Sequence, residues 1–476
     1  MHISRSKDLS RRAFLTRGAQ LAGLGVAAPL AMNLAGFGEA AAAGAEDYKA
    51  LVCVFLYSGN DQSNTLVPYD TANYDLYSAI RGGGSGRTRG GIAWGRNDLA
   101  ATVLTPVAAQ TLTDNLQYAL APQLTGLKSL FAAGKMAIQL NVGPLVTPIT
   151  AAQFYGGNRA AYPVPPQLFS HNDQQSYWQS LATEGATQGW GGRLGDLMLS
   201  SNATSSLTCV TAAGNAVFLS GKTACQYQLD ASGAIAINAL NSPYFGNTST
   251  VAALKTLLAQ PTSHAMEGEY TRVTQRSIDM QGTVTAALNG LNLTTNFNPT
   301  GVANPLADQL KIVARMIAAR NGLGMKRQVF FVGLNGFDSH DNLMRDHPLL
   351  MTKLNEGLTA FYNATVEMGV ADNVTAFTAS DFGRTLTSNG DGSDHGWGGH
   401  HFIVGGAVNG GQYYGTAPHV SVATDDQVGQ GRLLPTTSVD QMAATLVRWF
   451  GVPDSQMTTV LPRIGNFATA DLGFMG

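Results

Sequence analysis

Nearly continuous apolar runs of strand length recur along the chain, separated by segments with helical spacing. The runs have the pattern of strands buried on both faces of a sheet, and they span residues 49–57, 136–142, 327–334 and 374–379. Helices are predicted over 304–320, which Asn304 can cap, and over 349–368. This alternation predicts an α/β fold in which helices cover both faces of a central, mostly parallel sheet.

Polar turns follow three of these strands directly. They span Ser58–Thr65, Asn335–Asn342 and Ser380–Arg384. Because the carboxyl ends of parallel strands meet at one edge of a sheet, we expect the three turns to lie together and to form a ligand site. The alternative is that the Asn, Asp, Ser and Gly residues of these segments only make tight turns.

These turns, and the glycine-rich loop after the third, carry carboxylates and imidazoles that could hold metal ions. The candidates are Asp61, Asp338, His340, Asp381 and His395. Aspartate and histidine together suit zinc, manganese or iron, whereas oxygen ligands alone suit magnesium or calcium. A site of one or two divalent ions at this edge could activate a hydroxyl or a water and stabilise a leaving oxygen.

Ser170 is a candidate nucleophile or phosphate contact. It precedes a predicted helix that carries Tyr177 and Trp178, and a helix N-terminus stabilises anions. The ordinary role of a serine at this position is to cap the helix. Arg384 or Arg193 could clamp an anionic group, since a planar guanidinium binds such groups through two hydrogen bonds.

Residues 1–45 have the pattern of a twin-arginine export signal. Residues 10–15, SRRAFL, are followed by a mild apolar stretch over 21–37 and by small residues at 41–43. The apolar stretch is too short and too weak to predict a membrane span. We therefore expect export by the twin-arginine machinery to the periplasm or the outside of the cell. Residues 46–476 would form a single domain without a membrane span, and 200–300 would be a cap or insertion over the sheet.

Composition limits the possible partners. The formal net charge is −2 and only 13% of residues are charged. No basic stripe is present, which argues against nucleic acid as a partner. Of the three cysteines, Cys53 lies in an apolar strand and is expected to be a packed thiol, while Cys209 and Cys225 could form a disulfide in an oxidising compartment.

Several segments together resemble a known family. They are YSGNDQSNTLVPYD, LFSHNDQQSYW, GWGGRLGD, GLNGFDSH, TASDFGRTLTSNGDGSDHGWGGHHFIVGGAVNGG and GRLLPTTSVDQMAATLVRWFGV. They look like the twin-arginine-exported domain-of-unknown-function family 1501, which is similar to the sulfatase and alkaline phosphatase superfamily. The resemblance implies an alkaline-phosphatase-like three-layer sandwich. It also implies one ion held by Asp338, His340 and His395, a second held by Asp61 and Asp381, and Ser170 between them as nucleophile.

The chain departs from that superfamily where Phe382 follows Asp381 in place of a histidine. Asn60 or Asp394 could substitute in the second site. The first functional hypothesis is an exported, metal-dependent hydrolase of a phosphate or sulfate ester or a related anionic group. The second is a non-catalytic exported binding or assembly protein that retains the fold with a degenerate metal site. A third, a single-metal protein with a different reaction, also fits Asp338, His340 and His395.

Overall fold

The computed structural model describes residues 48–82, 91–240, 242, 246–247, 249–258, 260, 262 and 264–476. The predicted export signal lies outside the described residues and stays a prediction. No helix in the described part of the chain combines the length and the apolar character needed to cross a bilayer.

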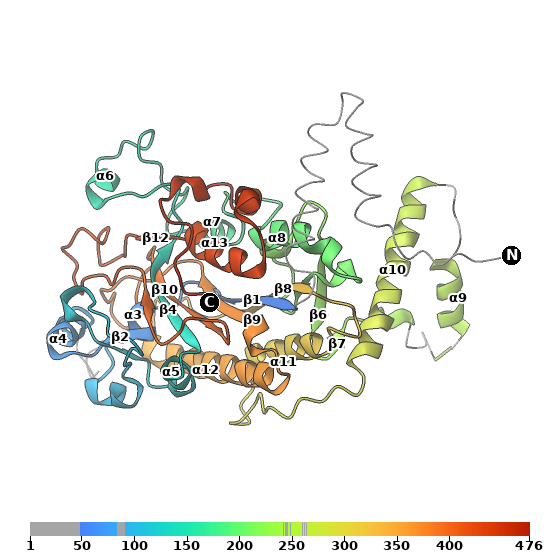
Figure 1. Ribbon diagram of the computed structural model, residues 1–476, viewed down its shortest axis with the longest axis horizontal. Helices are drawn as coiled ribbons and strands as arrows, with labels where there is room; N and C mark the ends of the chain where they lie inside the picture. The colour runs from blue at the N-terminus through green and yellow to red at the C-terminus, as the bar shows by residue number, and fades with distance from the viewer. Residues whose placement is uncertain are drawn as a thin grey trace.

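One large sheet runs through the described part of the chain, with ten strands in the order β11-β4-β10-β9-β1-β8-β5-β6-β7 and β12 beside β4 (Figure 1). Parallel pairing joins β9, β1, β8, β5 and β6 in its middle, and β10 runs antiparallel between β9 and β4. The strands are β1 (Lys49–Leu56), β4 (Met136–Gly143), β5 (Cys209–Thr211), β6 (Gln226–Asp230), β7 (Gly233–Ala234), β8 (Arg327–Leu334), β9 (Val374–Ser380), β10 (Gly399–Gly405), β11 (Tyr413–Tyr414) and β12 (Thr437–Ser438). The four apolar runs are therefore strands of one sheet, as predicted.

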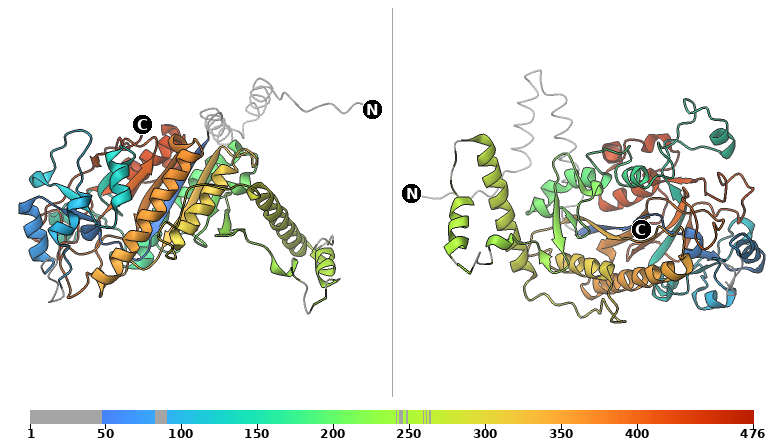
Figure 2. Two further views of the ribbon diagram at one scale, coloured as in Figure 1. Left: turned by 90° about the horizontal axis from the view of Figure 1, so that it is seen from below. Right: turned by 180° about the vertical axis from the view of Figure 1, so that it is seen from behind.

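Helices cover both faces of this sheet, as Figures 1 and 2 show. Alternate residues of β1 point to opposite faces: Val52 and Val54 pack into one core, and Cys53 and Phe55 pack into the other. The first core includes α5 (Thr125–Ala132), α11 (Pro305–Ala318) and α12 (Leu343–Glu367), and the second includes α7 (His171–Ser180), α8 (Trp190–Met198) and α13 (Val439–Phe450). The predicted α/β sandwich with helices on both faces is confirmed.

Local capping explains where two of the helices begin. The Asn304 side chain accepts a hydrogen bond from the backbone N–H of Ala307, and Pro305 opens α11. Ser438 and Gln441 form a reciprocal capping box at the start of α13. The remaining short elements are β2 (Leu66–Pro68), β3 (Tyr118–Leu120), α3 (Gln62–Thr65), α4 (Thr71–Ile80), α6 (Ala151–Tyr155) and α14 (Met457–Val460).

The segment 200–300 has two parts. Its first part supplies β5 and β6, which extend the central sheet beyond β8. Its second part holds α9 (Ser249–Leu258) and α10 (Ala265–Leu288), which project beyond the sheet (Figures 1 and 2). The interpretation of 200–300 as a cap or insertion stays a prediction.

The cysteines do not pair. Cys53 is a buried free thiol, as expected from its place in β1. Cys209 is buried in β5, whereas Cys225 is exposed, and both are free thiols. The disulfide considered from the sequence is therefore not formed between these two residues.

Candidate metal centre

Three imidazoles converge on one carboxylate at the carboxyl edge of the sheet. The carboxylate belongs to Asp338, in the turn after β8. The Nε2 atoms of His340 and His395 lie 3.2 and 3.3 Å from its Oδ1, and Nε2 of His171 lies 3.5 Å from its Oδ2. The Nε2 atoms of His340 and His395 are 2.9 Å apart. Ligand atoms of His171, Asp338 and His395 all lie within 4.8 Å of one another. We call these three residues and His340 the ligand cluster.

Each imidazole of the ligand cluster also makes a hydrogen bond through Nδ1, the ring nitrogen that does not face Asp338. The Nδ1 atoms lie 2.7 Å from the carbonyl oxygen of Phe169 for His395, 2.8 Å from Asp381 Oδ2 for His171, and 3.2 Å from Asp394 Oδ1 for His340. Because each of these oxygens accepts a hydrogen bond, an imidazole that is neutral here carries its proton on Nδ1 and turns the Nε2 lone pair toward Asp338. Metal-binding histidines are oriented in this way.

The charge states of His395 and Asp338 favour cation binding. Burial lowers the pKa of His395, so its imidazole stays neutral, which is the form that binds a metal. Although partial burial opposes it, the hydrogen bond from Arg384 lowers the pKa of Asp338 and keeps that carboxylate ionised. The hydrogen bond with Asp381 raises the pKa of His171, so a cation that binds there would displace the proton of a protonated ring. Three imidazole nitrogens and one carboxylate form a donor set that suits zinc and related divalent ions.

Arg384 lies behind the ligand cluster. Its side chain is fully buried, and its Nη1 donates to Asp338 Oδ1 at 3.0 Å and to the carbonyl oxygen of Ser58 at 3.2 Å. Its Nε donates to the carbonyl oxygen of Ser393 at 3.1 Å. The structure thus places this residue, a candidate anion clamp, as a support that fixes Asp338. Arg193, the other candidate clamp, donates to carbonyl oxygens of Val460, Gln188 and Ser180.

The structure does not bring Asp61 to the ligand cluster. Asp61 caps α3, where its Oδ1 accepts from the backbone N–H groups of Ser63 at 3.0 Å and Asn64 at 3.1 Å. Its Oδ2 forms an ion pair with Arg81, and both side chains are fully buried. Both oxygens of this candidate ligand are therefore engaged within the fold.

Asp381 contacts a member of the ligand cluster, His171, but not the carboxylate on which the imidazoles converge. Its buried side chain accepts hydrogen bonds from the backbone N–H of Ser58 at 3.1 Å and from Gln175 Nε2 at 2.8 Å, in addition to its contact with His171. The predicted ligand Asp381 therefore lies behind His171, where it orients the ring.

Phe382 packs against two of the ligand rings. Its ring centroid lies 4.6 Å from that of His395 and 5.0 Å from that of His171, and its side chain is buried. Gly59 makes room for it: a Cβ there would lie 2.4 Å from a ring carbon of Phe382, and the φ of Gly59 is +86°. An apolar ring thus lies where the family resemblance would place an imidazole of the second metal site.

The hydroxyl of Ser170 is bonded within its own helix. Ser170 is the N-cap residue of α7, and its Oγ donates to Asp173 Oδ2 at 2.8 Å. It immediately precedes His171, so its backbone is at the ligand cluster. Its role as a nucleophile stays a prediction.

His171 is the member of the ligand cluster that sequence reasoning missed. In the sequence it is simply the residue that follows Ser170. A usable signal is its spacing from Gln175: residues four apart lie on the same face of a helix, and both side chains reach Asp381. Asp394, considered as a substitute ligand, instead contacts Nδ1 of His340.

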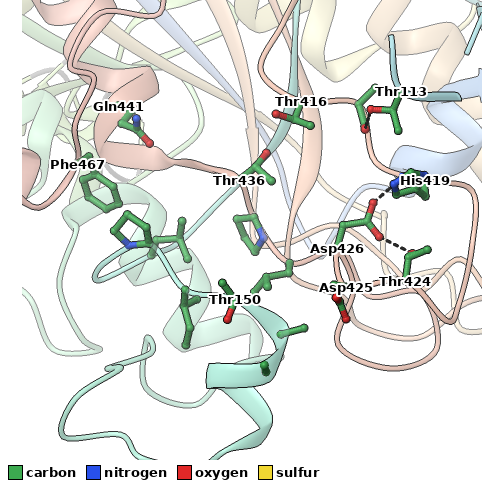
Figure 3. A pocket seen from close by; sticks show the side chains of 18 of the residues that line it. Thr113, Thr150, Thr416, His419, Thr424, Asp425, Asp426, Thr436, Gln441 and Phe467 are labelled. Carbon is green, nitrogen blue, oxygen red and sulfur yellow. Dashed lines mark hydrogen bonds between the residues drawn. The ribbon is translucent and has the colours of Figure 1, made fainter. Parts of the chain in front are cut away.

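The ligand cluster is open to solvent on one side. The side chains of Asp338 and His340 are 43% and 46% exposed. A separate cavity of about 1030 Å³ lies between α6, the start of α13 and the loop around Asp426, and no residue of the ligand cluster lines it (Figure 3). In that loop Asp426 accepts from the backbone N–H of His419 and from the hydroxyl of Thr424. The candidate chemistry is therefore at an exposed edge, outside this cavity.

Comparisons with known proteins give a family and a distant structural similarity. The family model described as "Protein of unknown function (DUF1501)" matches residues 48–461, which confirms the resemblance seen in the sequence. No protein of curated function matches the chain.

Solved structures similar to this chain include "Ps i-CgsB in complex with k-i-k-neocarrahexaose", at 10% identity and a TM-score of 0.33, covering 88% of this chain and 77% of that one. They also include the PsFucS1 sulfatase from Pseudoalteromonas sp., at 11% identity and a TM-score of 0.33, covering 89% and 71%. A mutant of the alkaline phosphatase PafA matches at 11% identity and a TM-score of 0.25, covering 71% and 64%. At these values the similarity says nothing about the reaction of this chain.

Proposed function

The chain belongs to the DUF1501 family of proteins of unknown function, and we propose that it is a metal-dependent hydrolase of a phosphate or sulfate ester or a related anionic group. One divalent ion would be held by His171, Asp338, His340 and His395. The observation that carries this proposal is the orientation of the three imidazoles, each held at Nδ1 by an oxygen acceptor with its Nε2 facing Asp338.

The bound ion would be the part of this site that attracts an anionic substrate. A divalent cation with one carboxylate and three neutral imidazoles has a net charge of about +1. The guanidinium of Arg384, fully buried beside Asp338, adds a positive charge close by, and the carboxylates of Asp381 and Asp394, which contact His171 and His340, add negative charges. A divalent ion bound there would polarise an ester oxygen and lower the pKa of a water molecule. Asp338 and the three imidazoles would fix its position, and the exposed side of the ligand cluster would admit the substrate.

Two sources of the attacking oxygen are distinguishable. Ser170 adjoins His171, but its hydroxyl donates to Asp173, so it would have to turn away from that carboxylate to attack. A water molecule needs no such change. If Ser170 is the nucleophile, Ser170→Ala abolishes hydrolysis and leaves metal binding intact. If water attacks, the same variant retains most of its activity.

A non-catalytic binding or assembly protein is the second candidate function. Two observations favour it: Phe382 fills the space beside His171 and His395 with an apolar ring, and the hydroxyl of Ser170 is bonded within its own helix. In that case the ligand cluster would bind an ion that organises the surface and carries out no reaction.

Metal analysis combined with an ester assay separates the two candidates. We expect about one equivalent of a divalent ion per chain, and hydrolysis of an aryl phosphate or aryl sulfate that is lost in His171→Ala. One bound ion without any hydrolysis would favour the binding protein. Absence of metal affinity in the wild-type chain would contradict both forms of the proposal.

We also propose that the chain is exported by the twin-arginine route to the periplasm or beyond. The proposal rests on SRRAFL at residues 10–15 and the apolar stretch that follows it. Replacing Arg11 and Arg12 together by lysine is expected to leave the precursor inside the cell in a fractionation experiment. Unchanged export of that double variant would argue against this route.

A further inference from the structure

Helix α10 carries an apolar stripe of which only half is covered. Met266, Tyr270, Val273, Met280 and Val284 recur at spacings of three, four and seven residues, which places them along one side of the helix. At the C-terminal end Val284 is fully buried and Met280 packs against the main core. At the N-terminal end Met266, Tyr270 and Val273 are 76%, 66% and 48% exposed. The C-terminal half of the stripe is therefore covered by the core, and its N-terminal half is exposed.

The position of α10 explains why this half is uncovered. The helix extends away from the sheet, with α9 beside it, and its C-terminal part meets the body near β7 (Figures 1 and 2). Leu257, at the end of α9, is also 62% exposed. Large apolar side chains gathered on a projecting element mark a surface that binds a partner.

The charges beside the stripe indicate which partner fits. Glu267 and Glu269 lie in its N-terminal part, and Arg272 and Arg276 follow in the next turns. Glu269 forms an exposed ion pair with Arg272 of its own helix, and a contact with Arg276 of a second copy would extend this pair. Consider two copies of α10 packed side by side in opposite directions, with the two-fold axis that relates them passing between Tyr270 and Val273. In this arrangement Tyr270 of each copy faces Val273 of the other. The same arrangement sets Glu269 of each copy beside Arg276 of the other. A parallel pair would instead place identical residues side by side.

From this pattern we propose that the exposed half of α10 binds the same half of α10 in a second copy of this chain, giving an antiparallel, two-fold dimer. A two-fold interface requires a surface that is complementary to itself, and the order of acidic and basic residues along this helix provides one. The contact lies on a different element from the ligand cluster, so it is independent of the proposed hydrolysis.

Sedimentation analysis of the full chain over a range of concentrations tests the apolar contact. The wild-type chain is expected to approach twice the monomer mass as concentration rises. Tyr270→Asp combined with Val273→Asp is expected to weaken association by at least about tenfold. Val366→Asp is the matched control, because Val366 is 53% exposed on α12, away from this surface. A wild-type chain that stays monomeric, or a double variant that associates like the wild type, would overturn the proposal.

A charge exchange tests the antiparallel register. In Glu269→Arg, the new arginine of each copy would lie beside Arg276 of the other copy. In Arg276→Glu, the new glutamate of each copy would lie beside Glu269 of the other copy. Each variant alone should therefore associate more weakly than the wild type. A mixture of the two should recover association, because every Arg then faces a Glu. If the mixture associates no better than the separate variants, the antiparallel pairing is wrong. Circular dichroism of each variant confirms that the helices are retained.

Discussion

The Nδ1 atom of His171 lies 2.8 Å from a buried carboxylate oxygen of Asp381. The two residues are 210 positions apart in the sequence, one at the start of α7 and the other directly after β9. Their contact determines which ring nitrogen of His171 faces Asp338. A residue expected to bind a metal directly thus lies in position to orient one of its ligands.

This contact predicts an intermediate effect of Asp381→Asn. The amide can still accept a hydrogen bond from His171 but supplies no negative charge, so metal affinity should fall about 10- to 100-fold. Calorimetric titration with zinc measures the loss. His171→Ala should cost more, since it removes a ligand itself. Equal losses of metal affinity in the two variants would show that Asp381 binds the ion directly. An unchanged metal affinity in Asp381→Asn would show that Asp381 does not support the metal site.

His395→Ala is expected to lower metal occupancy without unfolding the chain. The imidazole contributes Nε2 to the ligand cluster and is only half-buried, so its removal leaves the main cores intact. Elemental analysis of the purified variant gives the occupancy, and thermal unfolding gives the stability. His419→Ala is a suitable control, because His419 is exposed and pairs with Asp114 outside the ligand cluster. Occupancy equal to that of the control would exclude His395 from the site.

Gly59→Ala should damage both the fold and the metal site. Its added Cβ would lie 2.4 Å from Phe382 and would also be strained at φ +86°. Gly157→Ala, at φ +71° with nothing within 4 Å, has only the backbone cost, about 1–2 kcal/mol. Denaturant unfolding should show a larger loss for Gly59→Ala, because Phe382 must move. A metal affinity that drops only in Gly59→Ala would show that Phe382 positions the two imidazoles it contacts.

Asp440 should make stability depend on pH in the neutral range. It is buried near the start of α13, and its carboxyl oxygens have no hydrogen-bond partner among the residues that the structure describes. Burial raises the pKa of Asp440 from 3.8 to about 7, although the charges of Arg463 and Arg193 oppose this. The protonated carboxyl therefore stabilises the folded chain fully below pH 4, and this contribution is lost as pH rises through 7. The loss amounts to at most about 4 kcal/mol.

Asp440→Asn isolates that contribution, since it keeps the shape of the side chain and cannot ionise. Melting temperatures of the wild type and the variant should diverge between pH 4 and pH 8, with the wild type falling relative to the variant. Parallel curves over that range would show that Asp440 stays ionised in the folded chain, which would contradict its assigned environment.

The sequence predicted where the site lies better than which side chains form it. Apolar runs identified β1, β8 and β9, and the polar turns after them identified the sheet edge that holds Asp338 and His340. Whether a carboxylate faces an ion or another partner depends on its neighbours in space. Asp61 meets Arg81, which is 20 residues away and belongs to no motif. His171 was missed because its partner Asp381 comes from a distant strand, so no local pattern joins them.

The exposure of Asp338 and His340 has a practical consequence for anyone who isolates this protein. A cation seated there would touch bulk water, so small chelators could remove it and dilute salts could replace it while the chain stays folded. The metal found in a purified sample would then depend on the purification buffers as much as on the metal bound in the cell. Assigning the native ion calls for competition between cations at controlled free concentrations.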